Sequence, residues 1–205
     1  MSVLLHLDSS PRAERSHSRQ LSRAFVDTWK QAHPQDSVLY RDLGRQPPPH
    51  VTEPWIAGAY TPAESLTPEL KEALRVSNEL IDELLSADLI VLGAPMHNFG
   101  ITSSLKTYLD QVIRVGRTFE YPSYKGLALG KRLVVLTARG GGGYGPGEPM
   151  HSFNLQEPTI KNLFGFIGMT DVTFLHDEKT SQGDSELENS IARARDLAKE
   201  FILKK

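Results

Sequence analysis

Cysteine is absent from this chain of 205 residues. That absence excludes disulfide bonds, thiolate nucleophiles and cysteine metal ligands, and it fits the reducing cytoplasm, where we expect the protein to be located. The seven histidines show no spacing typical of metal ligands, so we expect no bound metal. The chain also lacks a leader-peptide pattern and any apolar run near the roughly 20 residues of a membrane helix, so we expect no membrane partner.

An excess of charge of one sign is missing as well. The formal net charge is −2, so no basic field attracts nucleic acid or an anionic membrane, and we expect no nucleic-acid partner. Hydrophobic residues make up 39% of the chain, as in ordinary globular proteins. The length suffices for one substantial core, so a single domain is expected over residues 1–205.

Five short runs of apolar and β-branched residues predict strands. They lie at residues 3–7, 38–40, 89–93, 133–137 and 172–175. Several are apolar on both faces, which is typical of a parallel sheet covered on both sides. Between them, apolar residues recur at helical spacing in the segments 21–29, 70–84, 105–113, 160–167 and 187–198. This alternation predicts a doubly wound α/β domain with helices on both faces of the sheet.

Capping signals predict where the helices begin. The second helix is expected to open at Thr67-Pro68, and the third to follow Ser103-Ser104. The fourth is expected near Glu157-Pro158, and the last at Ser185, where Glu188 three residues on completes a capping box. The proline-rich segment 46–68 then reads as a long surface loop, or equally as a loop at a partner subunit or at the rim of a site.

The loop after the first strand contains several hydroxyls and cations. Ser10, Ser16 and Ser18, with the free N–H groups of the coming helix, have the chemistry to surround a phosphate. Arg12 or Arg15 would favour its negative charge. The alternative is that Ser16 or Ser18 only caps the helix.

The loop after the third strand, residues 94–100, combines an aromatic ring, a thioether and an amide. Met96, Phe99 and Asn98 would line a flat ring and address its polar edge. The alternative is a proline turn in which Met96 and Phe99 are buried. His97 is a candidate acid or base, or simply an exposed histidine.

The loop after the fourth strand, residues 137–147, is rich in glycine, so its bare N–H groups can approach a ligand closely. The alternative is a flexible surface loop. Gly140, Gly142 and Gly145 satisfy G-x-G-x-x-G, but they follow the fourth strand and run into prolines rather than opening a helix. A Rossmann dinucleotide fold is therefore not expected.

Taken together, these loops resemble those of the bacterial FMN-dependent NADH:quinone oxidoreductases, also called FMN-dependent azoreductases. The similar segments span almost the whole chain and occur at matching strand ends. They are the opening L-D-S-S followed by S-H-S, then APMHNFGITSSLKTYLDQV, GRTFEY, ARGG and LFGFIGMTDV.

The resemblance implies a flavodoxin-like fold, with a five-stranded parallel sheet in the order 2-1-3-4-5, and a homodimer with two FMN sites near the interface. By the same resemblance, Ser10 and Ser16-His17-Ser18 would bind the FMN phosphate. The isoalloxazine ring would lie against Met96, His97, Asn98 and Phe99. Its pyrimidine end would lie against Ala138, Arg139, Gly140 and Gly141.

Two residues depart from the pattern. Members of the family commonly have tyrosine where His97 stands and often serine where Ala138 stands, so redox tuning by these side chains is open. Aromatic residues from the partner subunit are also implied over the flavin, for which Phe119 and Tyr121 are the candidates. Asn98 is expected to hydrogen-bond near N5 or O4 of the ring.

The implied activity is an FMN-dependent NAD(P)H:quinone oxidoreductase that also cleaves azo bonds reductively. NADH or NADPH would give a hydride to the flavin and leave before the quinone or azo acceptor takes its place, a ping-pong cycle. His97 as proton donor is a further hypothesis. The alternative class is a flavodoxin-like electron carrier or a non-catalytic flavin-binding protein, although a carrier usually has a strongly acidic face.

Overall fold

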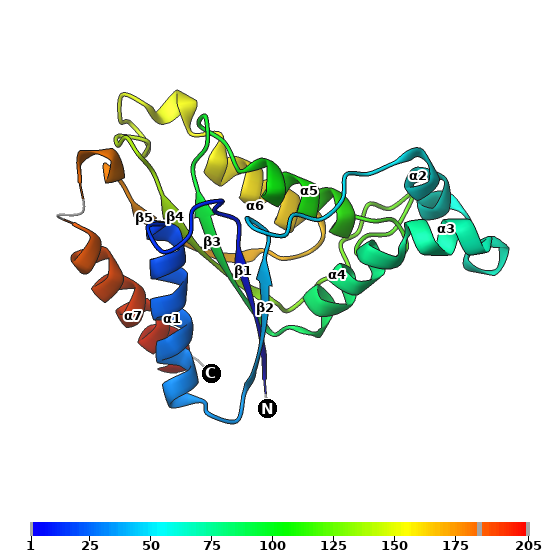
Figure 1. Cartoon of the computed structure of the whole chain (residues 1–205), viewed down its shortest axis with the longest axis horizontal. Coiled ribbons are helices and arrows are strands. Elements are labelled where there is room, and N and C mark those ends of the chain that lie inside the picture. The colour runs from blue at the N-terminus through cyan, green and yellow to red at the C-terminus, as the bar shows by residue number, and fades with distance from the viewer. Residues whose placement is uncertain (1, 184–185, 204–205) are drawn as a thin grey trace.

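Five parallel strands form one sheet in the order β2-β1-β3-β4-β5 (Figure 1). The computed structural model describes residues 2–183 and 186–203. The strands are β1 (Val3–Asp8), β2 (Ser37–Asp42), β3 (Leu89–Pro95), β4 (Arg132–Ala138) and β5 (Asp171–Asp177). Every neighbouring pair is parallel, so the predicted doubly wound α/β sheet and its strand order are confirmed.

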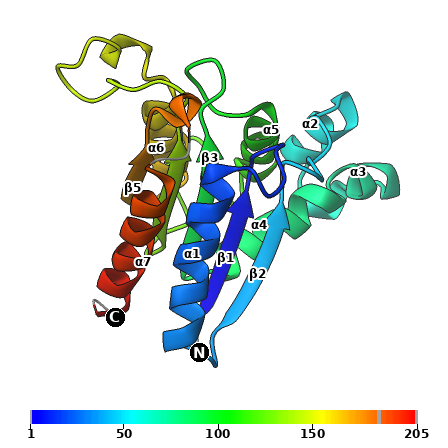
Figure 2. The ribbon, with the colours of Figure 1, turned by 60° about the vertical axis from the view of Figure 1, so that its left-hand side comes forward.

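Helices cover both faces of this sheet, as Figures 1 and 2 show. One face carries α1 (His17–Ala32) and α7 (Leu187–Leu203), which lie side by side. The other carries α4 (Arg75–Ser86), α5 (Ser103–Val112) and α6 (Gln156–Phe166). Consecutive strand residues point to opposite faces, so Leu4 packs with the α1/α7 layer while Leu5 packs with the other. This two-sided burial explains why the strand sequences are apolar throughout.

Each strand is longer than the apolar run that predicted it. The added residues include Asp8, Asp42 and Asp177 at the carboxyl ends of β1, β2 and β5. Backbone pairing continues through these positions because the ladder needs only N–H and C=O groups. The acidic strand ends therefore stand at the edge of the sheet where the loops begin.

The segment 46–68 is not a plain surface loop, which corrects the sequence-based expectation. It contains α2 (Glu53–Tyr60) and the short 3-10 turn η1 (Ala63–Ser65). The hydroxyl of Thr52 accepts a hydrogen bond from the N–H of Trp55 and so caps α2. Trp55 is buried, and its indole N–H donates to Gln111 at 2.8 Å. Burial of this one large side chain fixes the segment against α5.

The second predicted helix is two helices. It opens at Thr67 as expected, but α3 (Pro68–Ala73) ends at the buried Leu74, and α4 begins directly after it. The predicted capping residue of the last helix, Ser185, lies outside the described residues. In the described part of the chain no helix is long and apolar enough to cross a bilayer, and no three metal-binding side chains are grouped to hold an ion.

Candidate functional site

Four loops meet at the carboxyl ends of the strands. Helix α1 begins at the same edge of the sheet. The strand order reverses between β1 and β3, and such switch points form a crevice at the carboxyl ends of parallel strands. A cavity of about 210 Å³ lies there. It is lined by Ser10, Arg12, Ser16, His17, Pro95, Met96, His97, Ala138, Gly140, Thr180 and Ser181.

The first loop contributes buried hydroxyls next to a helix start. Ser10, Ser16 and Ser18 are each at most 2% exposed. Ser16 is the N-cap of α1 and accepts from the N–H of Arg19, so the capping alternative is also correct. Its hydroxyl lies 3.3 Å from that of Ser18. Ser16 therefore has both roles available, because it caps the helix and still lines the cavity.

Arg19 holds this loop in place from behind. Its guanidinium donates to the carbonyl oxygen of Ser10 at 2.6 Å and to the carboxylate of Asp42 at 2.5 Å. One cation thus joins the start of the loop, the first turn of α1 and the end of β2. The position of Ser10 is fixed through its backbone carbonyl, and its hydroxyl accepts from the N–H of Arg12.

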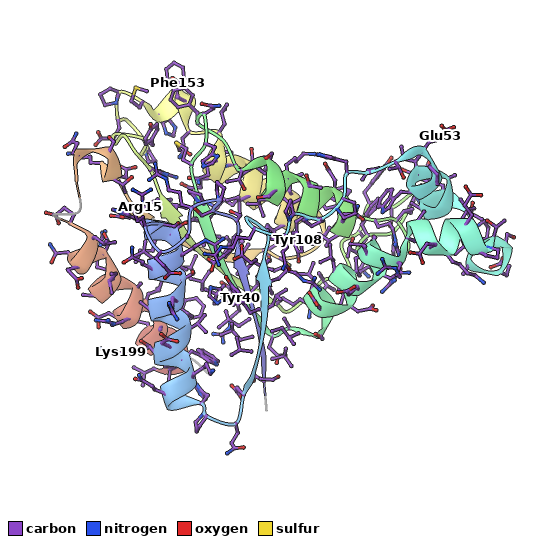
Figure 3. The ribbon with its side chains drawn as sticks, viewed as in Figure 1. Arg15, Tyr40, Glu53, Tyr108, Phe153 and Lys199 are labelled. Carbon is purple, nitrogen blue, oxygen red and sulfur yellow. The ribbon has the colours of Figure 1, made fainter. Side chains whose placement is uncertain are left out.

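The cavity lining favours an anion. Among its described lining residues are four hydroxyls, one arginine and two histidines, but no Asp or Glu. The first N–H groups of α1 point toward this end, and the helix dipole adds positive potential there. Arg15, labelled in Figure 3, does not line the cavity, whereas Arg12 does.

The second loop is a tight hairpin turn. His97 and Gly100 exchange two backbone hydrogen bonds, of 3.0 and 2.9 Å. Asn98 and Phe99 between them both have positive φ, 46° and 69°, as a type I′ turn requires. His97, Asn98 and Phe99 are exposed, and Met96 is half-buried. The alternative of a turn with a buried Phe99 is therefore wrong; its ring lies 5.1 Å from that of Phe153, an exposed residue at the outer edge of the molecule (Figure 3).

The third loop combines a buried side chain, that of Arg139, with the exposed residues Gly140 and Gly141. The side chain of Arg139 is 1% exposed and points into the protein, while Gly140 and Gly141 are exposed. The N–H groups of Gly140 and Gly141 donate to no described residue. Arg139 thus has no side-chain access to the cavity, and the loop presents peptide groups there instead.

A fourth segment, which sequence reasoning missed, completes the cavity. Thr180 and Ser181 belong to the short turn η3 (Thr180–Gln182) after β5. The signal was available, because a polar run directly following the last strand must reach the same edge of the sheet as the other strand-tip loops.

Several predicted site residues do not line this cavity. Ser18, Asn98, Phe99, Arg139 and Gly141 lie beside it rather than on its wall. Phe119 and Tyr121 do not line this cavity and lie in another part of the structure. The ring of Phe119 packs on Phe166 at 4.9 Å, and Tyr121 lines a separate cavity next to α2.

His97 stands between two cavities. Besides the first, it borders a second of about 410 Å³, which lies toward the start of α5. That space is lined by Pro11, Gly44, Pro47, Pro48, His50, His97, Thr102, Ser103, Ser104 and Thr107. The exposed hairpin turn is therefore open to ligands from both sides.

One titratable group behind the third loop has an altered pKa. The pKa of His176 is lowered by burial and by the positive charge of Arg139. The negative charge of Glu157 acts in the opposite direction but does not cancel these effects. The Nδ1 atom of His176 lies 2.8 Å from the hydroxyl of Thr137. His176 is therefore held in its uncharged form near neutral pH.

Comparison with known proteins shows the same fold and a common family. A family model described as flavodoxin-like fold matches residues 2–202. An FMN-dependent NADH:quinone oxidoreductase of Nostoc punctiforme is 49% identical over 201 residues, which cover 97% of each chain. FMN-dependent NADH:quinone oxidoreductase 2 of Trichormus variabilis is 50% identical over 205 residues, covering 98% of this chain and 99% of that protein. The crystal structure of an azoreductase from Bacillus anthracis superimposes with a TM-score of 0.86 over the full length of both chains, at 29% identity.

Proposed function

Because this chain belongs to the family of FMN-dependent NADH:quinone oxidoreductases with a flavodoxin-like fold, we propose that it binds FMN non-covalently and reduces quinones with NADH or NADPH. Azo compounds are proposed as second acceptors, in keeping with the name of the Bacillus anthracis azoreductase. The observation that carries the proposal is the cavity itself, where strand-tip loops present hydroxyls, a cation and no described carboxylate.

The chemistry of the lining fits the phosphate of FMN. A phosphate dianion needs hydrogen-bond donors and positive potential, and this end of the cavity offers Ser10, Ser16, Arg12 and the start of α1. We assign the phosphate to these groups together with His17. Ser18 supports them through its hydrogen bond to Ser16.

The hairpin turn and the glycine loop fit the ring. We assign Met96, His97, Asn98 and Phe99 to the ring face and its N5 and O4 edge. Ala138, Arg139, Gly140 and Gly141 are assigned to the pyrimidine end, Arg139 through its backbone only. When bound there, FMN supplies two-electron hydride chemistry. The N–H groups of Gly140 and Gly141 would stabilise negative charge at that end.

Donor and acceptor would use the same open space in turn, which predicts ping-pong kinetics. His97 is placed to hold or release a proton there, since it is exposed and borders both cavities. We further propose a homodimer, in which Phe119 and Tyr121 of one subunit approach the site of the other. Tyr121 is 69% exposed, as such a contact requires.

We also propose that residues 1–205 act as a single domain in the cytoplasm. Support for one domain comes from the single sheet, whose strands extend from Val3 to Asp177 along the chain. Support for the location comes from the supply of reduced nicotinamides there and from the lack of cysteine.

The test is the visible spectrum of the purified protein, before and after anaerobic addition of NADH. We expect flavin absorbance that NADH bleaches and that a small quinone restores. Ser10→Ala is expected to weaken FMN binding by about tenfold to 150-fold, because a hydrogen bond to a charged group contributes about 1.5–3 kcal/mol. Ser65→Ala, an exposed serine far from the cavity, is the control.

Two results would contradict the proposal. A protein that stays colourless and does not take up added FMN would remove the cofactor. A protein that binds FMN but is not reduced by NADH or NADPH would point instead to an electron carrier or a non-catalytic flavin protein.

A further inference from the structure

Arg139 is a buried cation whose side chain the proposed chemistry does not use. Its guanidinium donates from Nε to Gln156 at 3.1 Å, from one terminal nitrogen to Glu178 at 3.2 Å, and from the other to Asn154 at 3.5 Å. Burying a charge is costly unless it is paired and hydrogen-bonded. Its three partners lie on two segments, Asn154 and Gln156 at the start of α6 and Glu178 after β5, so the side chain is a junction that connects these segments to the glycine loop.

Gln156 extends this junction to the hairpin turn. It is fully buried, and both ends of its amide are used. The oxygen accepts from Arg139, and the nitrogen donates to the carbonyl of Ala94 at 3.0 Å. Ala94 leads directly into the 95–100 turn, as Arg139 leads into the glycine loop. One buried amide therefore joins the bases of the two loops assigned to the ring.

Glu178 extends the junction to the far side of the glycine loop. One carboxylate oxygen accepts from Arg139, and the other accepts from the N–H of Gly143 at 3.1 Å. The loop between residues 139 and 143 is thus held at both ends by a single ion pair. This contact adds to the backbone hydrogen bonds that the loop carbonyls accept, and together they restrict four consecutive glycines that are intrinsically flexible.

The carbonyl groups of the loop fix the direction of its N–H groups. The carbonyls of Arg139 and Gly140 accept from the N–H groups of Thr180 and Ser181, at 3.1 and 3.2 Å. In a planar trans peptide the C=O and the following N–H point in opposite directions. The N–H groups of Gly140 and Gly141 therefore face away from η3.

From these contacts we propose that Arg139 and Gln156 are positioning residues for the reduction of bound FMN. They hold the Gly140 and Gly141 N–H groups and the 95–100 turn in one fixed arrangement around the ring. The inference rests on the proposed function, because it takes the pyrimidine end of FMN to lie at Gly140 and Gly141. Neither side chain touches the cofactor, and both act through the backbone.

The effect falls on the reduced cofactor more than on the oxidised one. Negative charge develops at the pyrimidine end on reduction, and fixed N–H groups stabilise it without having to reorganise. A loosened loop would have to become ordered when the charge appears, and the free-energy cost of that ordering would make reduction less favourable. Loss of the junction is therefore expected to lower the reduction potential of bound FMN, a property that packing alone would not set.

The experiment compares two conservative variants with a matched control in the FMN-loaded protein. Arg139→Lys keeps the charge but not the three-way fork, and Gln156→Met keeps the size but not the two hydrogen bonds. The control is Arg132→Lys at the other end of β4, where the side chain stacks on Phe201 and lies away from the cavity. Reduction potentials are measured by equilibration with reference dyes, alongside the dissociation constant of oxidised FMN.

For both variants we expect reduced FMN to be bound about tenfold less tightly relative to oxidised FMN, which is about 30 mV for a two-electron couple. The control is expected to match the unmodified protein. A second readout needs no cofactor: hydrogen exchange at the hydrogen-bonded amides of His97, Gly100 and Gly143 in the FMN-free protein should quicken together in both variants. If a variant loads FMN poorly, unchanged exchange at these amides would still overturn the positioning role.

The outcomes separate this inference from the proposed function. If the unmodified protein binds FMN and both variants keep its potential and loop exchange rates, the positioning role is wrong while the proposed function stands. If the unmodified protein does not bind FMN, both are wrong. If the exchange rates rise without any change of potential, the junction is structural only and the inference is again overturned.

Discussion

His17 Nδ1 lies 2.8 Å from Oδ2 of Asp177, so the first residue of α1 is hydrogen-bonded to the last residue of β5. The other oxygen of Asp177 accepts from Ser190 in α7 at 2.7 Å. The carboxylate is almost fully buried. It orients the His17 imidazole, which lines the end of the cavity that we assign to the phosphate.

The first prediction concerns this pair. Asp177→Ala removes both hydrogen bonds and is expected to destabilise the protein by about 2–3 kcal/mol and to weaken FMN binding, because His17 loses its orientation. Asp177→Asn keeps an acceptor and should retain most of the stability. Urea denaturation and FMN fluorescence titration measure the two effects. Equal stability of the Ala and Asn variants would mean that these hydrogen bonds contribute little.

The second prediction concerns the hairpin turn. Asn98 has a φ of 46°, which asparagine tolerates and β-branched residues do not. Asn98→Val is expected to cost about 1–2 kcal/mol of folding free energy, whereas Asn98→Gly should cost none. Both are measured by chemical denaturation without FMN. A valine variant as stable as the glycine variant would contradict the left-handed turn.

The third prediction concerns Gly93, which faces a buried carboxylate. A Cβ atom there would lie 2.3 Å from Oδ1 of Asp8 and 3.1 Å from the carbonyl oxygen of Ser18. Gly93→Ala should therefore destabilise the protein by about 1–3 kcal/mol or more, as overpacking does. Gly165→Ala is the control. It lies in α6 with open space around it, so alanine should raise stability by about 0.5–1 kcal/mol.

The fourth prediction concerns pH. The pKa of His176 is lowered by burial and by the charge of Arg139, so the unfolded chain binds a proton at a higher pH than the folded protein does. Stability from this group is complete above the ordinary histidine pKa of about 6.5 and is lost as the pH falls toward the folded pKa. His176→Gln should abolish the part of the stability loss at low pH that comes from this group, whereas substitution of the exposed His50 by glutamine should not. Identical pH profiles for the original protein and His176→Gln would refute it.

The strand pattern was predictable because burial on both faces leaves a continuous apolar run in the sequence. The chemistry of the loops was also visible, since Ser16 has both the capping and the cavity-lining position that its sequence context indicates. These features depend on residues near one another in the chain. Patterns among residues close together in the sequence therefore sufficed to predict most of the fold and three of the four segments that line the cavity.

What the sequence did not reveal depends on long-range contacts. The resemblance placed Arg139 at the pyrimidine end of the ring, yet Gln156 and Glu178 hold its side chain inside the protein. The segment 46–68 looked irregular because of its prolines, yet a partner for Trp55 on α5 makes part of it helical. Neither partner is marked in the neighbouring sequence, so periodicity and composition had no means of indicating them.

The four segments that line the cavity lie far apart along the chain, and the last of them is synthesised near the end of translation. During synthesis the nascent chain emerges with Ser10–His17 first, then the turn at His97, then Gly140, and only near its end Thr180 and Ser181. The carbonyls that aim the glycine loop have no donors until that final stretch has left the ribosome. A chain truncated before β5 would therefore lack both the Thr180–Ser181 wall of the cavity and the N–H donors that fix the glycine loop.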